Sequence, residues 1–145
     1  MEYAWKRIAA PSLLSMTILL TNCSKPETSP PAIVEAEALS LTEFTNRVEN
    51  YFEYEPLRSG KASQVRIHLT DLSDGSPVEK AEVTLTARSM GVAAVAAETT
   101  ARVGKVTGIY VAELTLQQQG LYDIEFHIKN DKLDERMPLS NFKVE

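Results

Sequence analysis

Apolar and polar residues alternate with a period of two along most of the chain beyond residue 42. A β-strand points successive side chains to opposite faces, so this alternation predicts strands with one apolar and one polar face. No stretch sustains the 3.6-residue spacing of an amphipathic helix. The clearest alternating runs are residues 65–70, 83–88, 110–116 and 122–129. Such runs are typical of antiparallel sheets that bury one face and expose the other to water.

Turn-forming residues separate these runs, as in the segment Asp74-Gly75-Ser76-Pro77. Weaker alternation adds three expected strands, near residues 47–54, 92–99 and 139–144. About seven short strands in roughly 100 residues predict an all-β fold, an immunoglobulin-like antiparallel β-sandwich that occupies residues 42–145.

The segment Gly120-Leu121-Tyr122 has the form of a tyrosine corner. In such a corner, a tyrosine near the start of a late strand bonds through its hydroxyl to the backbone a few residues upstream. The sequence is equally compatible with Tyr122 as a simple core aromatic.

The N-terminus has the pattern of a bacterial export signal. Lys6 and Arg7 precede a largely apolar stretch, residues 8–20, that is too short to span a bilayer as a helix. The stretch ends in Leu20-Thr21-Asn22-Cys23, which resembles a lipobox, although Asn22 departs from the small residue usual before the cysteine. We therefore expect residues 1–22 to be a lipoprotein signal peptide and Cys23 to carry the lipid. The alternative is an ordinary signal peptide that leaves Cys23 as a free thiol.

The segment 23–41 is predicted to be a lipid-anchored, proline-rich spacer, because its first part is polar and lacks apolar periodicity. Its last ten residues are ambiguous between spacer and a helical turn. The predicted location is the periplasm, on the inner or the outer membrane. Ser24 follows the cysteine in place of the Asp that is typical of inner-membrane retention, which favours the outer membrane without settling the choice.

Charge narrows the range of partners. The chain has 15 Lys and Arg against 20 Asp and Glu, a net charge of −5, and removal of residues 1–22 would make it −6. An acidic module lacks the basic surface that nucleic-acid binding requires. The single cysteine also excludes an internal disulfide.

No local signature of catalysis is present. There is no Gly-x-Ser-x-Gly elbow and no glycine-rich phosphate loop, so we expect neither an enzyme nor a bound cofactor. Asp71 and Asp74 surround a turn, where aspartate more often bonds the local backbone.

The weak metal-ligand candidates are His68 and His127, which both fall on polar strand faces and could be brought together by strand pairing. Met90 and Met137 could add the thioether ligands that Cu(I) prefers. No His-x-His or Met-x-x-Met spacing supports such a site. A stand-alone periplasmic metal- or ligand-binding lipoprotein is thus the alternative function.

The segment 51–78 resembles the N-terminal domain of the periplasmic adaptor (membrane fusion) subunits of RND-type efflux pumps, in the branch that includes copper and heavy-metal exporters. An aromatic strand leads into a Pro-Leu turn, and a second strand then ends in a turn before Pro-Val. The matching positions are Phe52, Tyr54, Pro56, Leu57, Gly60, Ser63, His68, Leu69, Thr70, Leu72, Asp74, Pro77 and Val78. Two later Gly-x-Tyr strand starts, at Tyr110 and Tyr122, are also similar to the family.

The resemblance implies a module that acts by protein–protein contact in the export of metal ions or other compounds. Its implied partners are an RND pump and an outer-membrane channel, besides the membrane that holds the lipid. The family's barrel, lipoyl-like and helical-hairpin domains have no counterpart in these 145 residues, nor do its methionine-rich copper motifs. We therefore expect either a truncated adaptor or a free-standing domain of the same kind.

Mass spectrometry of the mature N-terminus tests the lipid anchor. We expect the processed chain to begin at Cys23 and to carry added acyl mass, because the resemblance to a lipobox predicts cleavage before this cysteine and lipid attachment to it. An unmodified Cys23 at the mature N-terminus would contradict the anchor and leave export itself intact.

Overall fold

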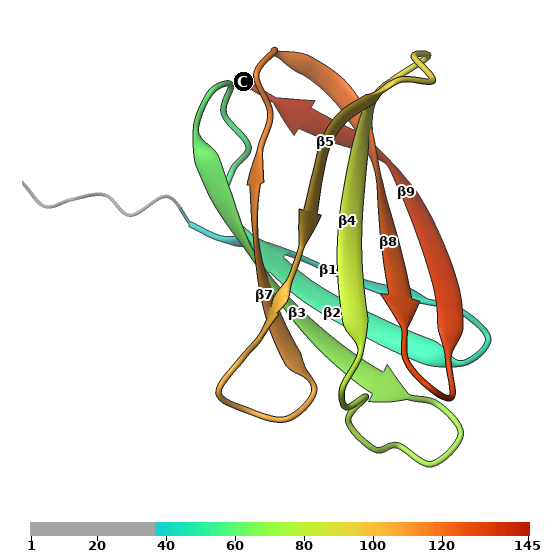
Figure 1. Ribbon diagram of the computed structural model, residues 1–145. Coiled ribbons are helices and arrows are strands. Elements are labelled where there is room, and N and C mark those ends of the chain that lie inside the picture. The colour runs from blue at the N-terminus through green and yellow to red at the C-terminus, as the bar shows by residue number, and fades with distance from the viewer. Residues whose placement is uncertain (1–36) are drawn as a thin grey trace, which may run out of the picture. The chain divides into compact units, whose positions relative to one another are not determined.

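The computed structural model describes residues 37–145, and this part of the chain is built entirely from strands and turns. It contains nine strands, shown in Figure 1. They are β1 Leu39–Phe44, β2 Val48–Tyr54, β3 Ala62–Asp71, β4 Glu82–Ser89, β5 Val95–Thr100, β6 Arg102–Val103, β7 Ile109–Thr115, β8 Gly120–Lys129 and β9 Asp134–Val144.

The strands form two antiparallel sheets. One has five strands in the order β1-β2-β3-β7-β6, and the other has four in the order β5-β4-β8-β9. The chain passes from the second sheet to the first at Ala101, between β5 and β6. The predicted all-β fold, an antiparallel sandwich, is confirmed.

Nine strands are present in the described residues where about seven were expected, because β1 and β6 were not predicted. β1 begins at Leu39, inside the segment predicted to be spacer, and β9 begins at Asp134 rather than near residue 139. The two-residue β6 was not expected. β1 escaped prediction because most of its side chains are exposed on both faces, so burial imposes no clean alternation on its sequence. Its strand conformation comes from unbroken pairing with β2.

The core lies between the sheets and contains the apolar side of each alternating run. In β3, for example, Val65, Ile67 and Leu69 are buried, and in β8 Ile124, Phe126 and Ile128 are. Aromatic rings join the layers: the ring centroid of Phe52 on β2 lies 4.8 Å from that of Phe126 on β8. Tilted aromatic pairs at this distance contribute about 0.5–1.5 kcal/mol beyond the burial of their area.

Two buried tyrosines fix the connections between strands. The Tyr122 hydroxyl donates a hydrogen bond to the Gln118 carbonyl oxygen over 3.0 Å, which is the predicted tyrosine corner. The Tyr110 hydroxyl donates to the Val78 carbonyl oxygen over 2.8 Å and accepts from the Ala81 backbone N–H over 3.0 Å. Tyr110 therefore holds the segment that carries the chain from one sheet to the other.

The β6–β7 loop packs tightly against the β3–β4 loop at Gly108. This glycine has a φ of 79°, and a Cβ on it would lie 2.6 Å from Cβ of Pro77. Its carbonyl oxygen also accepts a hydrogen bond from the Leu69 backbone N–H over 2.9 Å. Glycine is required here both for its left-handed conformation and for the close approach.

Replacement of Gly108 by alanine should lower the free energy of unfolding by roughly 2 to 5 kcal/mol. Left-handed strain accounts for about 1–2 kcal/mol, and the forced displacement of the rigid Pro77 ring adds about 1–3. Denaturant unfolding followed by far-UV circular dichroism measures the change.

Gly75→Ala is the matched control. Gly75 has a φ of 73°, and a Cβ there would meet no atom within 4 Å, so only the conformational strain of roughly 1–2 kcal/mol should appear. Equal losses at Gly75 and Gly108 would contradict the steric role of the Pro77 contact.

Candidate functional surfaces

The structure separates the two histidines that sequence analysis considered as a pair. His68 lies on β3 in the five-stranded sheet, and His127 lies on β8 in the four-stranded sheet. Each sits between two buried neighbours on its strand, so each side chain is on the outer face of its own sheet. The expectation that strand pairing could bring them together is wrong, because β3 and β8 belong to opposite layers.

His68 is part of a small group on the outer face of the five-stranded sheet. Its ring packs edge-on against Tyr51, with centroids 5.3 Å apart, and its Nε2 lies 4.0 Å from Oε2 of Glu53. The same Glu53 oxygen lies 3.9 Å from the Arg66 guanidinium. The arrangement is a cross-strand packing and charge cluster of the kind that stabilises a solvent-facing sheet surface.

His127 has a close partner on the adjacent strand of the other sheet. Its Nε2 lies 2.7 Å from Oδ1 of Asp134, and Lys129 Nζ lies 3.7 Å from Oδ2 of the same carboxylate. The hydrogen bond from His127 is the main reason that the pKa of Asp134 lies below its ordinary value, and Lys129 adds to the effect. The imidazole is thus engaged by a carboxylate.

The two methionines do not join either histidine. Met90 is exposed in the β4–β5 loop, whereas Met137 is buried on β9, with its sulfur 3.7 Å from Nδ2 of Asn50. Within residues 37–145, no group of three or more His, Cys, Asp or Glu side chains lies close enough to hold a metal ion.

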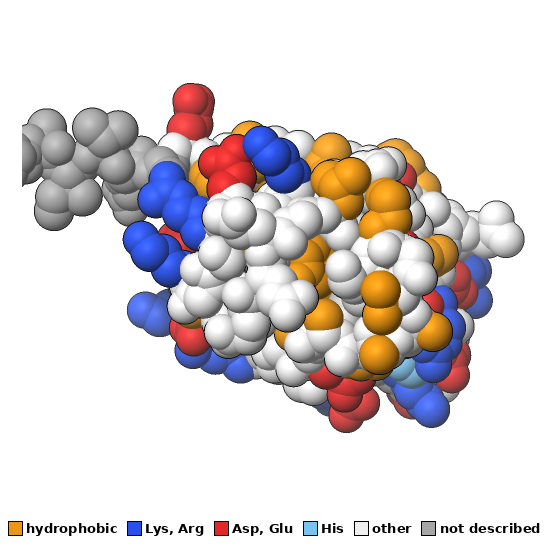
Figure 2. Space-filling model, turned by 90° about the horizontal axis from the view of Figure 1, so that it is seen from above, with side chains coloured by type: hydrophobic (Ala, Val, Ile, Leu, Met, Phe, Trp, Pro, Cys, Tyr) orange, Lys and Arg blue, Asp and Glu red, His pale blue; other side chains and the backbone are white. Residues whose placement is uncertain are grey.

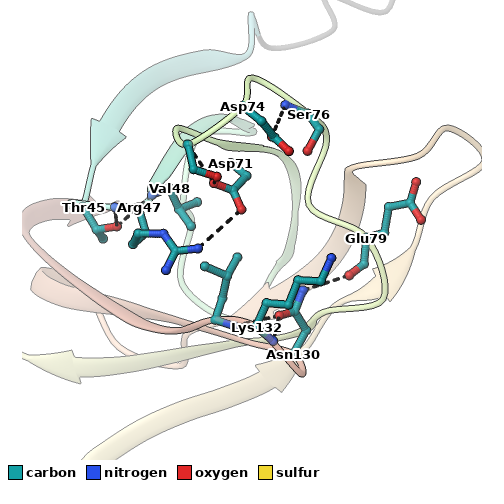
Figure 3. A network of polar contacts seen from close by, with 11 residues as sticks. Thr45, Arg47, Val48, Asp71, Asp74, Ser76, Glu79, Asn130 and Lys132 are labelled. Carbon is teal, nitrogen blue, oxygen red and sulfur yellow. Dashed lines mark hydrogen bonds and ion pairs between the residues drawn. The ribbon is translucent and has the colours of Figure 1, made fainter.

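Asp71 and Asp74 bond the β3–β4 turn, as their positions suggested (Figure 3). Asp71 Oδ1 accepts hydrogen bonds from the Ser73 hydroxyl over 2.6 Å and from the Ser73 backbone N–H over 2.8 Å. Asp74 Oδ1 accepts one from the Ser76 backbone N–H over 2.9 Å. These serine hydrogen bonds lower the pKa of both carboxyl groups. Both carboxylates therefore bond the local turn.

The same end of the sandwich contains a hollow of about 210 Å³ between the β3–β4 and β8–β9 loops. Asn130 spans the two loops, because its Nδ2 donates to the Glu79 carbonyl oxygen over 3.0 Å. Its Oδ1 accepts from the backbone N–H groups of Lys132 and Leu133. Arg47 directly precedes β2, and its guanidinium Nη2 lies 3.7 Å from Oδ2 of Asp71 (Figure 3). The polar groups at this end are thus used to hold loops together.

The positions that carry the family resemblance have structural roles. Phe52, Leu57 and Val78 are core residues, and Tyr54 and Ser63 lie at its margin, where burial raises the pKa of Tyr54. The Ser63 hydroxyl donates to the Glu55 carbonyl oxygen over 2.6 Å. Leu69 is a further core residue on β3, next to the outward-facing His68. The others form turns and their flanks: Pro56, Gly60, Thr70, Leu72, Asp74 and Pro77. The motif describes the β2–β3 hairpin and its exit into β4.

An uncharged apolar surface lies at the opposite end of the sandwich, on the β4–β5 loop and its neighbour. We call it the β4–β5 tip, and it consists of Met90, Val92, Ala93, Ala94, Val95 and Leu121. Met90, Val92, Val95 and Leu121 are each 43–52% exposed. Figure 2 looks onto this end and shows apolar side chains among uncharged surface, with charged side chains at the periphery. Sequence analysis treated Met90 only as a possible ligand, although residues 89–97 are an uncharged run.

The backbone holds the tip in place. The Val92 N–H donates to the Ser89 carbonyl oxygen over 2.9 Å, and Gly91 between them has a φ of 78°, so the loop turns tightly. The Met90 N–H donates to the Leu121 carbonyl oxygen over 2.8 Å, which ties the loop to the start of β8. The apolar side chains are therefore presented on a fixed frame.

Searches of protein-family models, curated proteins and solved structures give no match to this chain. Among residues 37–145 there is no helix of the length and hydropathy that a membrane crossing requires. The predicted signal peptide and the predicted lipid site at Cys23 lie outside the described residues.

His127→Ala should raise the pKa of the Asp134 carboxyl toward its ordinary value. Lys129→Ala should raise this pKa less, because the His127 hydrogen bond is the larger cause. A carboxyl whose pKa is lowered on folding stabilises the fold above its unfolded pKa, and that contribution is lost as pH falls through the lowered value. NMR titration of the Asp134 carboxyl carbon in each variant measures the shift. A larger effect of Lys129→Ala would contradict this ranking.

Proposed function

We propose that this chain is an exported, lipid-anchored binding module that acts by protein–protein contact through the β4–β5 tip. The tip is the observation that carries the proposal. An exposed apolar surface on a fixed loop lowers the solubility of a protein, and such surfaces mark sites of interaction. Methionine and small aliphatic side chains adapt readily to a partner's apolar surface.

A protein suits the tip better than a lipid surface does. Segments that lie in a membrane interface combine apolar side chains with Lys or Arg, and often with Trp or Phe. Residues 89–97 contain none of these four residue types. Association with a protein needs only that the apolar surface be complementary in shape.

The partners we propose are those that the resemblance implies, an RND-type pump and its outer-membrane channel. Support comes from the order of the motif positions and from the sandwich that they build, together with a lipid anchor that would hold the module in the periplasm. The metal-binding alternative relied on His68 and His127 sharing a face, and with these residues on opposite layers no observation favours it.

A photo-crosslinking amino acid at position 92 tests the proposal in native cells. We expect crosslinks from position 92 to an inner-membrane pump or a channel protein, identified by mass spectrometry. Position 106 is the matched control, since Val106 is 61% exposed but lies in the β6–β7 loop at the other end of the sandwich (Figure 1). Crosslinks to lipid alone, or the same proteins from both positions, would overturn the proposal.

The double variant Val92→Asp, Val95→Asp should reduce recovery of the crosslinking partner in co-purification at least tenfold. Two carboxylates in an apolar contact would have to be desolvated without a counter-charge. Val106→Asp should leave recovery within twofold, and both proteins should keep the wild-type unfolding midpoint. Unchanged recovery with the double variant would show that the tip is not the contact.

A further inference from the structure

The two methionines within residues 37–145 differ in their access to solvent. Met90 is 43% exposed in the β4–β5 loop, whereas Met137 is 3% exposed on β9. Peroxides oxidise the thioether of methionine to a sulfoxide, which turns a flexible apolar side chain into a polar one. A dissolved oxidant can reach the side chain of Met90, while the core shields that of Met137.

The surroundings of Met90 make its oxidation consequential. Met90 belongs to the β4–β5 tip, whose other side chains are all hydrocarbon: Val92, Ala93, Ala94, Val95 and Leu121. A sulfoxide oxygen accepts hydrogen bonds, and none of these side chains has a donor to offer it. When a partner covers the tip, this oxygen would lose its bonds to water without replacement, which opposes binding.

The frame of the loop does not depend on the side chain of Met90. The Met90 N–H bonds the Leu121 carbonyl oxygen. The Val92 N–H bonds the Ser89 carbonyl oxygen. Both bonds join backbone atoms, which oxidation of the sulfur leaves unchanged. The modification should therefore alter the chemistry of the tip while the loop keeps its place.

Met137 provides a contrast within the same chain. Its sulfur lies 3.7 Å from Nδ2 of Asn50, a side chain that is fully buried in the core. A sulfoxide at Met137 would place a polar oxygen in this core and destabilise the fold. Oxidation at Met137 should thus accompany unfolding, whereas oxidation at Met90 should occur in the folded protein.

We propose that Met90 is a modification site through which oxidants control the β4–β5 tip, so that the tip binds its partner as the thioether and releases it as the sulfoxide. This inference rests on the function proposed for the tip. Hydrogen peroxide is a sufficient oxidant. The sulfur attacks one peroxide oxygen, the S–O bond forms as the O–O bond breaks, and the second oxygen leaves as water with the proton of the first. The sulfur loses two electrons and the peroxide gains them.

Reversal of the modification needs thiols from outside the chain. Two reductases, one for each epimer at sulfur, return methionine sulfoxide to the thioether. Two thiols become a disulfide in the process, and the sulfoxide oxygen leaves as water. The single cysteine, Cys23, is the predicted site of the lipid, so the chain does not supply these thiols. The proposed export would also remove the chain from the thiol-reducing cytosol, which favours persistence of the oxidised tip.

Peroxide treatment of the full chain, purified in mild detergent, tests the site. Peptide mass spectrometry over time should show the mass of one added oxygen at Met90 at least tenfold faster than at Met137. The unfolding midpoint of chains oxidised at Met90 alone should equal that of untreated chains. Equal rates at the two methionines, or a lowered midpoint, would overturn the proposal.

Crosslinking from position 92 in cells tests control of the tip. A pulse of hydrogen peroxide that oxidises Met90 in nearly all chains should reduce the yield of partner crosslinks at least tenfold. In Met90→Leu the yield should fall less than twofold, because leucine keeps a similar apolar volume and forms no sulfoxide. Damage to the partner itself would lower both yields equally. Met90→Gln, which places a polar amide at this position, should reduce the yield without peroxide.

The outcomes separate this inference from the function on which it rests. An absence of protein crosslinks in untreated cells would refute the tip as a contact. Crosslinks that persist after peroxide, or that fall equally in wild type and Met90→Leu, would refute control by Met90 and leave the tip as the contact. A wild-type yield from Met90→Gln would likewise refute control by Met90 alone.

Discussion

The structure depends on contact between the two apolar sheet faces, and the packing of Phe52 against Phe126 is the closest aromatic contact across them among the described residues. Phe142 and Tyr54 extend this contact toward the margin of the core. A sandwich of this size has one core, so every inward side chain contributes to the same cooperative unit. The surfaces outside it are free to vary in chemistry because they do not hold the layers together.

Local alternation predicts the strands well wherever one face is buried. The runs that became β3, β4, β7 and β8 were identified from alternation alone, because the core removes their apolar side chains from water. β1 and β6 were missed because neither shows a buried period: β1 exposes both faces, and β6 has only two residues. Strand order is not encoded in alternation. The sequence therefore placed His68 and His127 on polar faces correctly without revealing that these faces belong to different sheets.

The two Gly-x-Tyr segments show what such a local motif can and cannot predict. Around Tyr122, the hydroxyl bonds a carbonyl four residues upstream, so a short sequence window contains both partners. The Tyr110 hydroxyl instead bonds Val78 and Ala81, which are about thirty residues away along the chain. The motif is the same in both cases, but only tertiary packing determines the partner at Tyr110. The β4–β5 tip carried a readable signal, the uncharged run 89–97, which strand prediction absorbed as an ordinary strand.

An exposed apolar loop and an open strand edge are both aggregation hazards in a small domain. The net charge of −5 offsets the hazard, because copies of an acidic protein repel one another. The distribution of this charge matters more than its sum. Glu43 lies on β1, the last strand of its sheet, and Glu49 and Glu53 lie on the neighbouring β2, whereas the β4–β5 tip is uncharged. Repulsion between copies therefore acts at the strand β1, where backbone pairing between copies would otherwise be easiest, and it is weaker at the uncharged tip.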